Sequence, residues 1–377
     1  MNFGFSEEQE SLRTAARRFL AAECPTAFVR QMMAHETAHS GELWAKLADL
    51  GWAGLTVPRE LGGTGATFLD AAVILEETGA ALLPGPLFAT AMLGVPTIVA
   101  AGSRRQKVEL LPRVARGEAI VTLAVSEGSA DQHAAGIRLR ATRDGRDFVL
   151  NGGKRSVPDA AVAQWIVVAA RTSRSATDGI TLFLVEADAP GITVTPTAGA
   201  DLTRRSYRLS FRGVRVRPGR VLGHRDRGWT TLRRVLRSAT AAISIETVGV
   251  AQRVLDRSIE YARNRTQFGR PIGSFQAIQH RCVDMLVAIE NARSLAYYAA
   301  WAVDQDATGV DLAVAMAKAY CSDIGTRVTA DAIQVHGGVG FTWDNDMHVY
   351  YRRALANAAA FGTAPLHREA VARELRL

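Results

Sequence analysis

Two clusters of residues in the second half of the chain have side chains suited to ligand chemistry. The first, at residues 261–276, reads YARNRTQFGRPIGSFQ and contains three arginines, among them Arg265. The planar guanidinium of arginine binds phosphate oxygens through paired hydrogen bonds. Gln267 and Phe268 add an amide and an aromatic face that suit a heterocyclic ring. The segment is therefore either a binding site for a phosphorylated, ring-bearing molecule or an ordinary loop with solvated arginines.

The second cluster, at residues 334–342, reads QVHGGVGFT. Closely spaced glycines let a backbone approach a ligand, because they have no Cβ. The spacing is not GxGxxG and no strand-like run precedes it, which excludes a dinucleotide-binding turn of the Rossmann type. The alternative is a glycine-rich end of a helix. A single histidine in this setting, His336, is more typical of a structural role than of catalysis.

Hydrophobic periodicity divides the chain into three regions that must position these clusters. Residues 1–118 are helical in pattern, with a break where Pro58 and several glycines interrupt the periodicity. Residues 119–224 contain short strand-like runs without a long helix between them, which predicts a small β-barrel or sandwich. Residues 225–377 return to a period of 3.6 residues and predict an up-down four-helix bundle. We therefore expect an α+β multidomain fold in the order α, β, α.

The strand-like and helical runs have definite predicted limits. The strands are expected at residues 119–125, 137–141, 148–153, 165–170, 181–185, 207–211 and 214–216. The long helices of the last region are expected at about 229–264, 274–305, 311–335 and 345–360.

Composition excludes several classes of protein. The formal charge is +8, but the basic residues are scattered, so no nucleic-acid site is expected. The three cysteines form no CxxC pair, which argues against a disulfide framework and against a zinc site, and no metal is expected. No apolar run approaches the roughly 18 residues that span a bilayer. The start of the chain lacks the features of a signal peptide, so a cytoplasmic protein without membrane insertion is expected.

The two clusters, in this order and about 60 residues apart, resemble the pattern of the acyl-CoA dehydrogenase family. Further resemblances cover nearly the whole chain. FGFSEEQESLR resembles the opening helix of the family, and LGWAGLTVPRELGGTG resembles its N-terminal glycine-rich loop. AVSEGSAD resembles the TEPxAGSD loop beside the flavin, and LNGGKRSVPDAAVAQWIVVAAR resembles a segment of the family's barrel. The sequence is identified as a member of this family, in a divergent branch of actinobacterial type.

The resemblance implies FAD, an acyl-CoA thioester, an electron-transfer flavoprotein or similar acceptor, and a homo- or hetero-oligomer. In the family, a carboxylate removes the α-proton while the β-hydride passes to the flavin. Several side chains and glycines reach the FAD of a neighbouring subunit, and a serine or threonine contacts the isoalloxazine ring. Carried over to this sequence, the cofactor-binding residues are Ser126, Arg265, Gln267, Phe268, Gln276, Gln334, Gly337, Gly338 and Thr363.

The base of the family has no counterpart in this chain. The commonest base is a glutamate in a Tyr-Glu-Gly-Thr run, where this sequence has Ala360-Phe361-Gly362-Thr363. Another branch places the base ten residues before a glycine on the first bundle helix. Counting back from Gly249 reaches Ala239, which cannot accept a proton.

Two carboxylates are candidates for the missing base. Glu246 lies two turns after Ala239 on the same predicted helix, and its apolar neighbours would desolvate it. The alternative for Glu246 is a structural carboxylate paired with a bundle arginine. Asp344 follows the glycine cluster and is the weaker candidate, because an N-cap of the last long helix explains it as well.

Further departures affect the flavin contacts. The Trp-Ile-Thr run that covers one flavin face is replaced by Ser156-Val157-Pro158, and an arginine of the first bundle helix is replaced by Thr240. The proline and one glycine of TEPxAGSD are missing around Glu127-Gly128-Ser129. These changes fit a divergent branch with bulky substrates and also fit a subunit that has lost its own active site.

Three functions are therefore open. The first is a dehydrogenase that produces a 2,3-enoyl-CoA. The second is a non-catalytic or half-site subunit of a heteromeric dehydrogenase, and the third is a flavin monooxygenase or oxidase on the same fold. Phe361 favours the second function over the first, whereas Glu246 favours the first. The acyl group, and the choice between CoA and an acyl carrier protein, are not encoded in recognisable residues.

Overall fold

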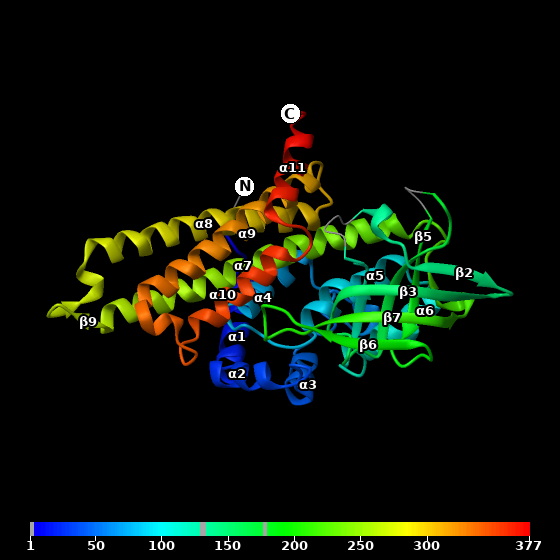
Figure 1. The fold of residues 1–377 in the computed structure, drawn as a ribbon, viewed down its shortest axis with the longest axis horizontal. Coiled ribbons are helices and arrows are strands. Elements are labelled where there is room, and N and C mark those ends of the chain that lie inside the picture. Colours follow the sequence, from blue (N-terminus) through cyan, green and yellow to red (C-terminus); the bar gives the residue numbers. More distant parts are fainter. Residues whose placement is uncertain (1–3, 129–132, 176–178) are drawn as a thin grey trace.

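The computed structural model describes residues 4–128, 133–175 and 179–377, and Figure 1 shows its three regions in chain order. A group of helices comes first, a β-sheet follows, and a bundle of long helices comes last. The end of the AVSEGSAD segment, from Ser129 to Asp131, lies outside the described residues.

The first region consists of helices, several of which begin at a serine or threonine cap. In α1 the hydroxyl of Ser6 accepts the backbone N–H of Gln9, and the Gln9 side chain accepts the N–H of Ser6 in return. This capping box satisfies two otherwise unpaired donors. The predicted break contains a single 3₁₀ turn, η1 (Arg59–Leu61). The helices are α1 (Glu7–Glu23), α2 (Thr26–Ala34), α3 (Gly41–Asp49), α4 (Phe68–Ala80), the π-helical η2 (Ala89–Gly94), α5 (Val95–Ala101) and α6 (Arg104–Ala115).

The central region is one eight-stranded sheet. Its hydrogen-bonded path runs β6-β7-β3-β2-β4-β5-β8, and β1 joins β4 in parallel. Inward residues alternate with exposed ones along β7, which gives this region a core of its own. The strands are β1 (Val121–Ala124), β2 (Arg140–Asp144), β3 (Asp147–Pro158), β4 (Trp165–Arg171), β5 (Ile180–Glu186), β6 (Ile192–Thr197), β7 (Ser206–Val216) and β8 (Val221–Leu222).

The sheet differs from the sequence prediction at several strands, including β8, which was not predicted, and β3, which continues beyond residue 153 to Pro158. The two strands expected at 207–211 and 214–216 are one continuous strand, β7, because it pairs with β3 along its whole length. Strand β6 was not predicted, since its residues include Pro196. Its place at one end of the hydrogen-bonded path explains how it tolerates a proline, which cannot donate to a ladder.

The last region contains the four predicted long helices and a fifth, shorter one. They are α7 (Gly228–Asn264), α8 (Gln276–Asp304), α9 (Val310–His336), α10 (Met347–Ala359) and α11 (Ala364–Glu374). α11 was not predicted as a separate helix; Gly362 (φ 99°) precedes it and Pro365 lies in its first turn. None of the helices in the described part of the chain is both long and apolar enough to cross a membrane.

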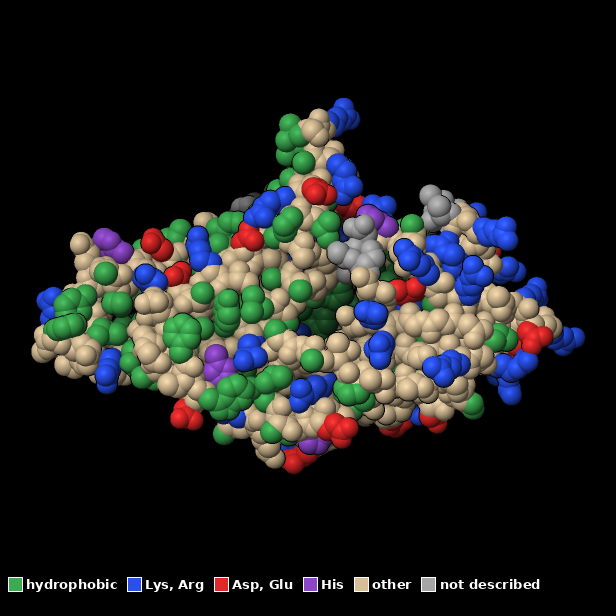
Figure 2. Space-filling view, in the orientation of Figure 1, with side chains coloured by type: hydrophobic (Ala, Val, Ile, Leu, Met, Phe, Trp, Pro, Cys, Tyr) green, Lys and Arg blue, Asp and Glu red, His purple; other side chains and the backbone are tan. Residues whose placement is uncertain are grey.

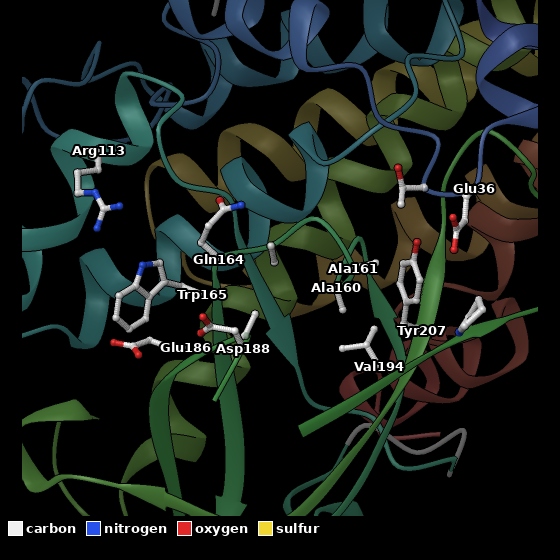
Figure 3. A pocket seen from close by; sticks show the side chains of 14 residues that line it. Glu36, Arg113, Ala160, Ala161, Gln164, Trp165, Glu186, Asp188, Val194 and Tyr207 are labelled. Carbon is white, nitrogen blue, oxygen red and sulfur yellow. The ribbon is translucent and has the colours of Figure 1, made fainter. Parts of the chain in front are cut away.

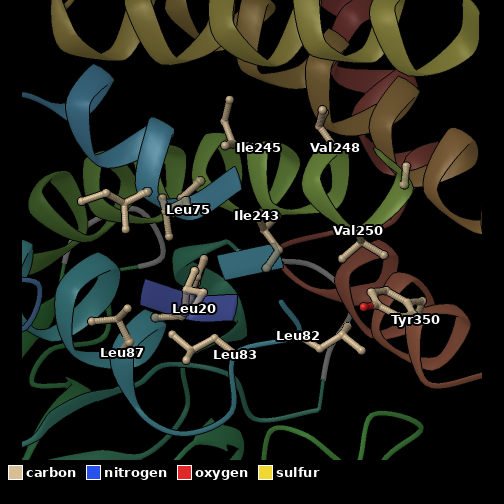
Figure 4. Close-up of a cluster of buried hydrophobic side chains, with 14 of the residues drawn as sticks. Leu20, Leu75, Leu82, Leu83, Leu87, Ile243, Ile245, Val248, Val250 and Tyr350 are labelled. Atoms are coloured by element: carbon tan, nitrogen blue, oxygen red, sulfur yellow. The ribbon is translucent and has the colours of Figure 1, made fainter. Parts of the chain in front are cut away.

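The first region and the bundle share one core. α4 packs directly on α7, where a Cβ on Gly79 would collide with the Glu246 carbonyl and a Cβ on Gly249 with the Glu76 carbonyl. Glycine is therefore required on both helices at their closest approach. Figure 4 shows the apolar side chains of this core, including Leu75, Leu83 and Ile243.

Helix α7 sets the distance between the sheet and the far tip of the bundle. Its 37 residues at 1.5 Å each span about 55 Å. It begins against the sheet, where Arg227 forms a bridge with Ile180, and ends at the far tip of the bundle. There β9 (Thr266–Gln267) and β10 (Arg270–Pro271) form a small hairpin that projects from the left end of Figure 1.

Candidate active site

The first predicted cluster forms an exposed hairpin at the tip of the bundle, which we call the arm (residues 265–271). Phe268 lies at its turn with φ 53° and is 92% exposed. Arg270 lies over the ring of Phe275, 4.1 Å from its centroid. Arg265 and Gln267 are exposed as well, and so is Gln276 at the start of α8. The arm is thus an ordered structure whose polar and aromatic groups face solvent.

The second cluster lies beside the arm. The ring of His336 stacks on Tyr261, with centroids 4.4 Å apart, and its Nδ1 is 2.8 Å from the Ala332 carbonyl oxygen. Burial lowers the pKa of His336. These contacts agree with the structural role predicted for this histidine. They also bring the ends of α7 and α9 together, so that Gln334 and Gly338 are exposed next to the arm.

The surface around the arm is unusually apolar. Phe341 is 77% exposed, Trp343 58% and Val339 48%. Large exposed aromatic groups clustered with arginines are typical of surfaces that bind another molecule.

Ser126 lies in a loop that follows β1, and the preceding Val125 packs against an apolar cluster that includes Leu232 and Ala239 of α7. The carbonyl of Ser126 accepts the N–H of Arg155, at 2.8 Å. The carboxylate of the next residue, Glu127, accepts the N–H of Leu139 and the ammonium of Lys154. Lys154 is fully buried, which lowers its pKa to about 8. The loop is therefore held firmly on the sheet, with Ser126 half-buried.

The long α7 separates Ser126 from the arm. Val125, next to Ser126, packs against an apolar cluster that includes Ala239 in the first third of α7, whereas Arg265 is the C-cap of α7, roughly 40 Å further along the helix axis. No side chain bridges such a distance. The two groups of predicted cofactor-binding residues cannot therefore contact one ligand within a single chain.

The loop between α10 and α11 contains the residues that correspond to the commonest base. Phe361 has φ 55°, its carbonyl oxygen lies 2.9 Å from Nε2 of His367, and its ring stacks on Phe88 at 6.1 Å. Buried Lys318 donates to the carbonyl of Asn357, at 2.6 Å, and so fixes the end of α10. Thr363 is exposed and precedes α11 without a side-chain cap.

Glu246 lies fully buried on α7 and is bound by two arginines. Its Oε2 accepts from Arg204 at 2.6 Å and its Oε1 accepts from Arg353 at 2.9 Å. Burial alone would raise the pKa of Glu246, but the two guanidiniums outweigh burial and lower it. This is the geometry of the structural alternative stated above, and it argues against a base whose pKa must rise.

Arg353 is the centre of a buried network that joins the three regions. Besides Glu246, its guanidinium donates to Asp201 at 2.6 Å, to the Thr203 hydroxyl and to the carbonyl of Leu83. The partners belong to α7, to the β6–β7 connection and to the segment after α4. Sequence reasoning missed this arginine, because nothing in its neighbourhood distinguishes it from the half-buried Arg352 next to it.

Asp159, at the end of β3, is a second residue that the sequence analysis missed. It is 1% exposed, has φ 52°, and its Oδ1 has no hydrogen-bond partner among the described residues. Burial raises the pKa of Asp159 to about 7, with Arg204 and Arg353 opposing the rise. The signal in the sequence was the replacement of the family's Trp-Ile-Thr run immediately before it.

Asp344 is exposed at the end of the bundle, away from Glu246 and Phe361. The N-cap of α10 is Asp346 and not Asp344, and the side chain of Asn345 accepts the N–H of Met347 at 2.9 Å. Asp346 forms ion pairs with Arg30 and Arg257. Neither role considered for Asp344, the base or the N-cap, has a supporting contact.

A cavity of about 570 Å³ lies between the first region and the sheet (Figure 3). Its walls include Glu36, Arg113, Trp165, Asp188 and Tyr207, and none of the predicted site residues lines it. A different hollow is visible in Figure 2 between the bundle and the sheet, with apolar side chains at its depth. In the described part of the chain, no group of three or more His, Cys, Asp or Glu side chains is arranged to hold a metal ion.

Comparison with known sequences connects these features to one family. The N-terminal, middle and C-terminal domain models of acyl-CoA dehydrogenases match residues 6–118, 122–232 and 226–376. A probable acyl-CoA dehydrogenase of Bacillus subtilis, YngJ, is 32% identical over the full length of both chains. The acryloyl-CoA reductase (NADH) of Anaerotignum propionicum is 29% identical over all of this chain and 96% of its own length.

Comparison with solved structures gives the same result. The FAD complex of PigA matches with a TM-score of 0.92 and 25% identity over the full length of both chains. The ChsE4-ChsE5 complex of Mycobacterium tuberculosis matches with a TM-score of 0.91 and 29% identity, over 100% of this chain and 99% of the other. The sequence matches, the order of the three regions and the placement of both motif clusters agree, and the chain belongs to the acyl-CoA dehydrogenase family, a family of FAD-binding oxidoreductases that act on CH–CH groups.

Proposed function

We propose that this chain is a subunit of an FAD-dependent enzyme that converts an acyl-CoA thioester to the 2,3-enoyl-CoA. The observation that supports this proposal most directly is the separation of Ser126 from the arm by most of the length of α7. A single chain contains both groups of flavin-binding residues, but they are too far apart to contact one FAD molecule. An oligomer in which the arm of one chain reaches the Ser126 loop of another would complete the site.

The residues present fit FAD in most respects. Arg265 offers a guanidinium for phosphate oxygens, and Gln267, Gln276 and Gln334 offer amides. At Gly338 the space that a Cβ would occupy has no atom within 4 Å, so the backbone is open to a ligand. Against the sheet, Ser126 offers a hydroxyl to the ring system. Pro158, by contrast, has no N–H, so β3 offers a flavin no backbone donor at this position.

When bound, FAD would accept the hydride from the β-carbon. The protein must supply a base for the α-proton and a dry, shaped pocket for the acyl chain. Phe361 and Ala239 provide apolar surface where relatives have a carboxylate. We propose that electrons then pass to an electron-transfer flavoprotein or a similar acceptor.

The geometry around Glu246 favours the half-site version of this proposal. Both carboxylate oxygens accept from guanidiniums, and the residue is fully buried. A proton could reach Glu246 only after at least one ion pair is broken, which is costly in a buried network. We therefore propose that the base belongs to a second, homologous chain, and that this chain contributes its arm to the FAD of that partner.

The composition of the purified complex tests the proposal. The protein should be isolated alone and after co-expression with a homologue encoded beside it, and FAD should be counted per chain. The half-site version predicts little flavin in the protein alone and one FAD shared by two different chains in the complex. Full flavin occupancy in a homo-oligomer that is bleached anaerobically by an acyl-CoA would instead support catalysis by this chain alone.

The variant Glu246→Gln separates the two roles of this carboxylate. If the base lies on another chain, the variant complex still bleaches its flavin with acyl-CoA, although it is less stable because two arginines lose a counter-charge. Glu246→Asp, which keeps the charge, serves as the matched control. Retention of flavin with complete loss of bleaching in Glu246→Gln, restored in Glu246→Asp, would identify Glu246 as the base.

A further inference from the structure

A row of side chains connects the loop between α10 and α11 with the buried arginine network. The ring of Phe361 stacks on Phe88 at 6.1 Å, and Cζ of Arg204 lies 5.0 Å from the centroid of the Phe88 ring. An acyl chain whose reacting carbons lie beside Phe361 and which follows Phe88 would therefore end at Arg204. The apolar part of the row suits methylene or ring carbons, and its end is polar.

Two polar atoms at this end have no partner. The Nη2 of Arg204 donates to Glu246, but its buried Nε has no hydrogen-bond partner among the described residues. The Oδ1 of Asp159 is likewise unpartnered, although the side chain is 1% exposed. The N–H of Asp159 donates to the carbonyl of Arg205 at 3.0 Å, and the Arg204 guanidinium lies near enough to the Asp159 carboxyl to oppose the rise of its pKa. Buried polar atoms are nearly always paired, so an unpaired donor beside an unpaired acceptor calls for a functional explanation.

The backbone of β3 is distorted where it places Asp159 inside. Ser156 and Asp159 have φ of 53° and 52°, which side chains other than glycine rarely adopt. The register between β3 and β7 also shifts between Lys154 and Val157. Strain of this kind persists only where the surrounding structure enforces it, and it is concentrated at binding sites. The distortion occupies the stretch in which the family's Trp-Ile-Thr run is replaced.

The charges at this end select one kind of oxygen. Two arginines, Arg204 and Arg353, face two carboxylates, Glu246 and Asp201, so the network is neutral before Asp159 is counted. Asp159 has a pKa raised to about 7 by burial, so it adds at most part of a negative charge at neutral pH. A substrate carboxylate would add a full negative charge, and the guanidiniums of Arg204 and Arg353 are already paired with carboxylates of this chain. A neutral hydroxyl or ketone oxygen adds none.

We propose that the acyl group carries a neutral oxygen substituent, a hydroxyl or a ketone, remote from the thioester, and that Arg204 Nε and Asp159 Oδ1 bind it. A hydroxyl oxygen accepts from Nε and its proton is donated to Oδ1; a ketone accepts from Nε and from the protonated Asp159 carboxyl. The inference rests on the proposed function and, within it, on an acyl group that lies beside Phe361 of this chain, whichever chain supplies the base; it names the class of acyl group that this pocket takes.

The test compares ligands by binding and not by turnover. The flavin-containing complex, as isolated, is titrated anaerobically with pairs of acyl-CoA thioesters that differ only in a remote hydroxyl or ketone. Dissociation constants are read from the change in the flavin spectrum and from calorimetry. We expect the oxygenated member of the best-fitting pair to bind about tenfold more tightly or better, since a site with unpaired buried polar atoms rejects the plain alkyl analogue.

Two variants of Asp159 make the test specific. Asp159→Leu should fold, because it removes a buried carboxylate with an unpartnered oxygen, and should reduce the preference to about threefold or less. Asp159→Asn keeps a hydrogen-bonding group and should retain most of the preference. Asp188→Leu removes an exposed carboxylate from the same sheet region and should leave the preference unchanged.

The outcomes separate the inference from the proposed function. Equal or tighter binding of the plain alkyl thioesters by the unmodified complex, or a preference that survives in Asp159→Leu, would overturn the inference while the dehydrogenase function stands. Tighter binding of thioesters with a remote carboxylate would overturn it as well. If no acyl-CoA of any kind perturbs the flavin, the proposed function fails, and the inference fails with it.

Discussion

The arm and the buried network are both rich in arginine, yet they use it in opposite ways. In the network, Arg353 is fully buried and its donors are occupied by Asp201, Glu246 and Thr203. In the arm, Arg265 is exposed and Phe268 next to it is 92% exposed. Arginines whose partners lie in the same chain stabilise the fold, whereas exposed arginines beside exposed aromatic groups indicate partners outside it.

This contrast also explains why the family resemblance locates the arm better than the base. A cofactor surface at a subunit interface is a short, contiguous stretch of sequence and keeps its residue pattern. The position of a base depends on packing between α7, α10 and the β6–β7 connection, which are far apart in the sequence. Glu246 looked like a desolvated base only because its two arginine partners, Arg204 and Arg353, are 42 and 107 residues away.

The largest expected effect is on stability, from replacing the central arginine of the network. Arg353→Met leaves Asp201 without a cation and Glu246 with only Arg204, and should lower the free energy of unfolding by about 3–5 kcal/mol. Urea unfolding followed by circular dichroism measures the loss. Arg352→Met, which changes a half-buried neighbour that forms no ion pair with the described residues, should cost about 1 kcal/mol or less. Equal losses in the two variants would contradict a structural role for the network.

The second effect is a dependence of stability on pH that originates at Asp159. The pKa of Asp159 is raised from 3.8 to about 7, so the folded protein binds this proton more tightly than the unfolded chain. The contribution of Asp159 to the free energy of unfolding is therefore most favourable below the unfolded pKa. It declines as pH rises to about 7, by up to about 4 kcal/mol. Asp201 and Glu246 have lowered pKa values, so their contribution is lost only at lower pH, as it falls through their folded pKa.

Asp159→Asn isolates this contribution. Between about pH 5 and pH 7 the unmodified protein should lose stability relative to the variant, and the two unfolding curves should converge at the acidic end of that window. Denaturant titrations at several pH values give the difference. A difference that does not change with pH would mean that Asp159 is ionised throughout, with a partner that the geometry does not provide.

The third effect concerns the arm and should leave stability untouched. Arg265→Ala removes the guanidinium expected to contact FAD phosphates across an interface, and loss of a charge-assisted hydrogen bond of about 1.5–3 kcal/mol weakens flavin binding about tenfold to a hundredfold. Flavin fluorescence during dialysis measures retention. Arg263→Ala changes an exposed arginine two residues earlier, on α7, and should retain flavin normally. Equal retention in the two variants would separate the arm from the cofactor site.

The sequence predicts the order of the regions and the long helices better than it predicts individual strands and buried side-chain contacts. The three regions, the four long helices and the capping box of α1 follow from periodicity and from local residue preferences. Strand β6 could not be predicted, because only its position at the edge of the sheet lets it contain a proline. Helix α11 could not be predicted as a separate helix, because the break at Gly362 depends on packing against residues that are distant in the sequence. In the same way, the unpartnered Asp159 depends on a distorted β3, for which the sequence offers only the unusual Ser156-Val157-Pro158.

The smallest expected effect is the difference in stability between variants of two aspartates near the start of α10. Asp346 forms ion pairs with Arg30 at 2.8 Å and with Arg257 at 2.6 Å, and all three side chains are mostly buried. Asp346→Asn should therefore cost about 1–3 kcal/mol, because two partly buried cations lose their counter-charge. Asp344, two residues earlier, is exposed, and Asp344→Asn should change stability by less than about 0.5 kcal/mol and leave flavin bleaching unaltered. Loss of bleaching in Asp344→Asn with flavin retained would return Asp344 to the site and would mean that the arm end of the bundle, and not the region of Phe361, supplies the base.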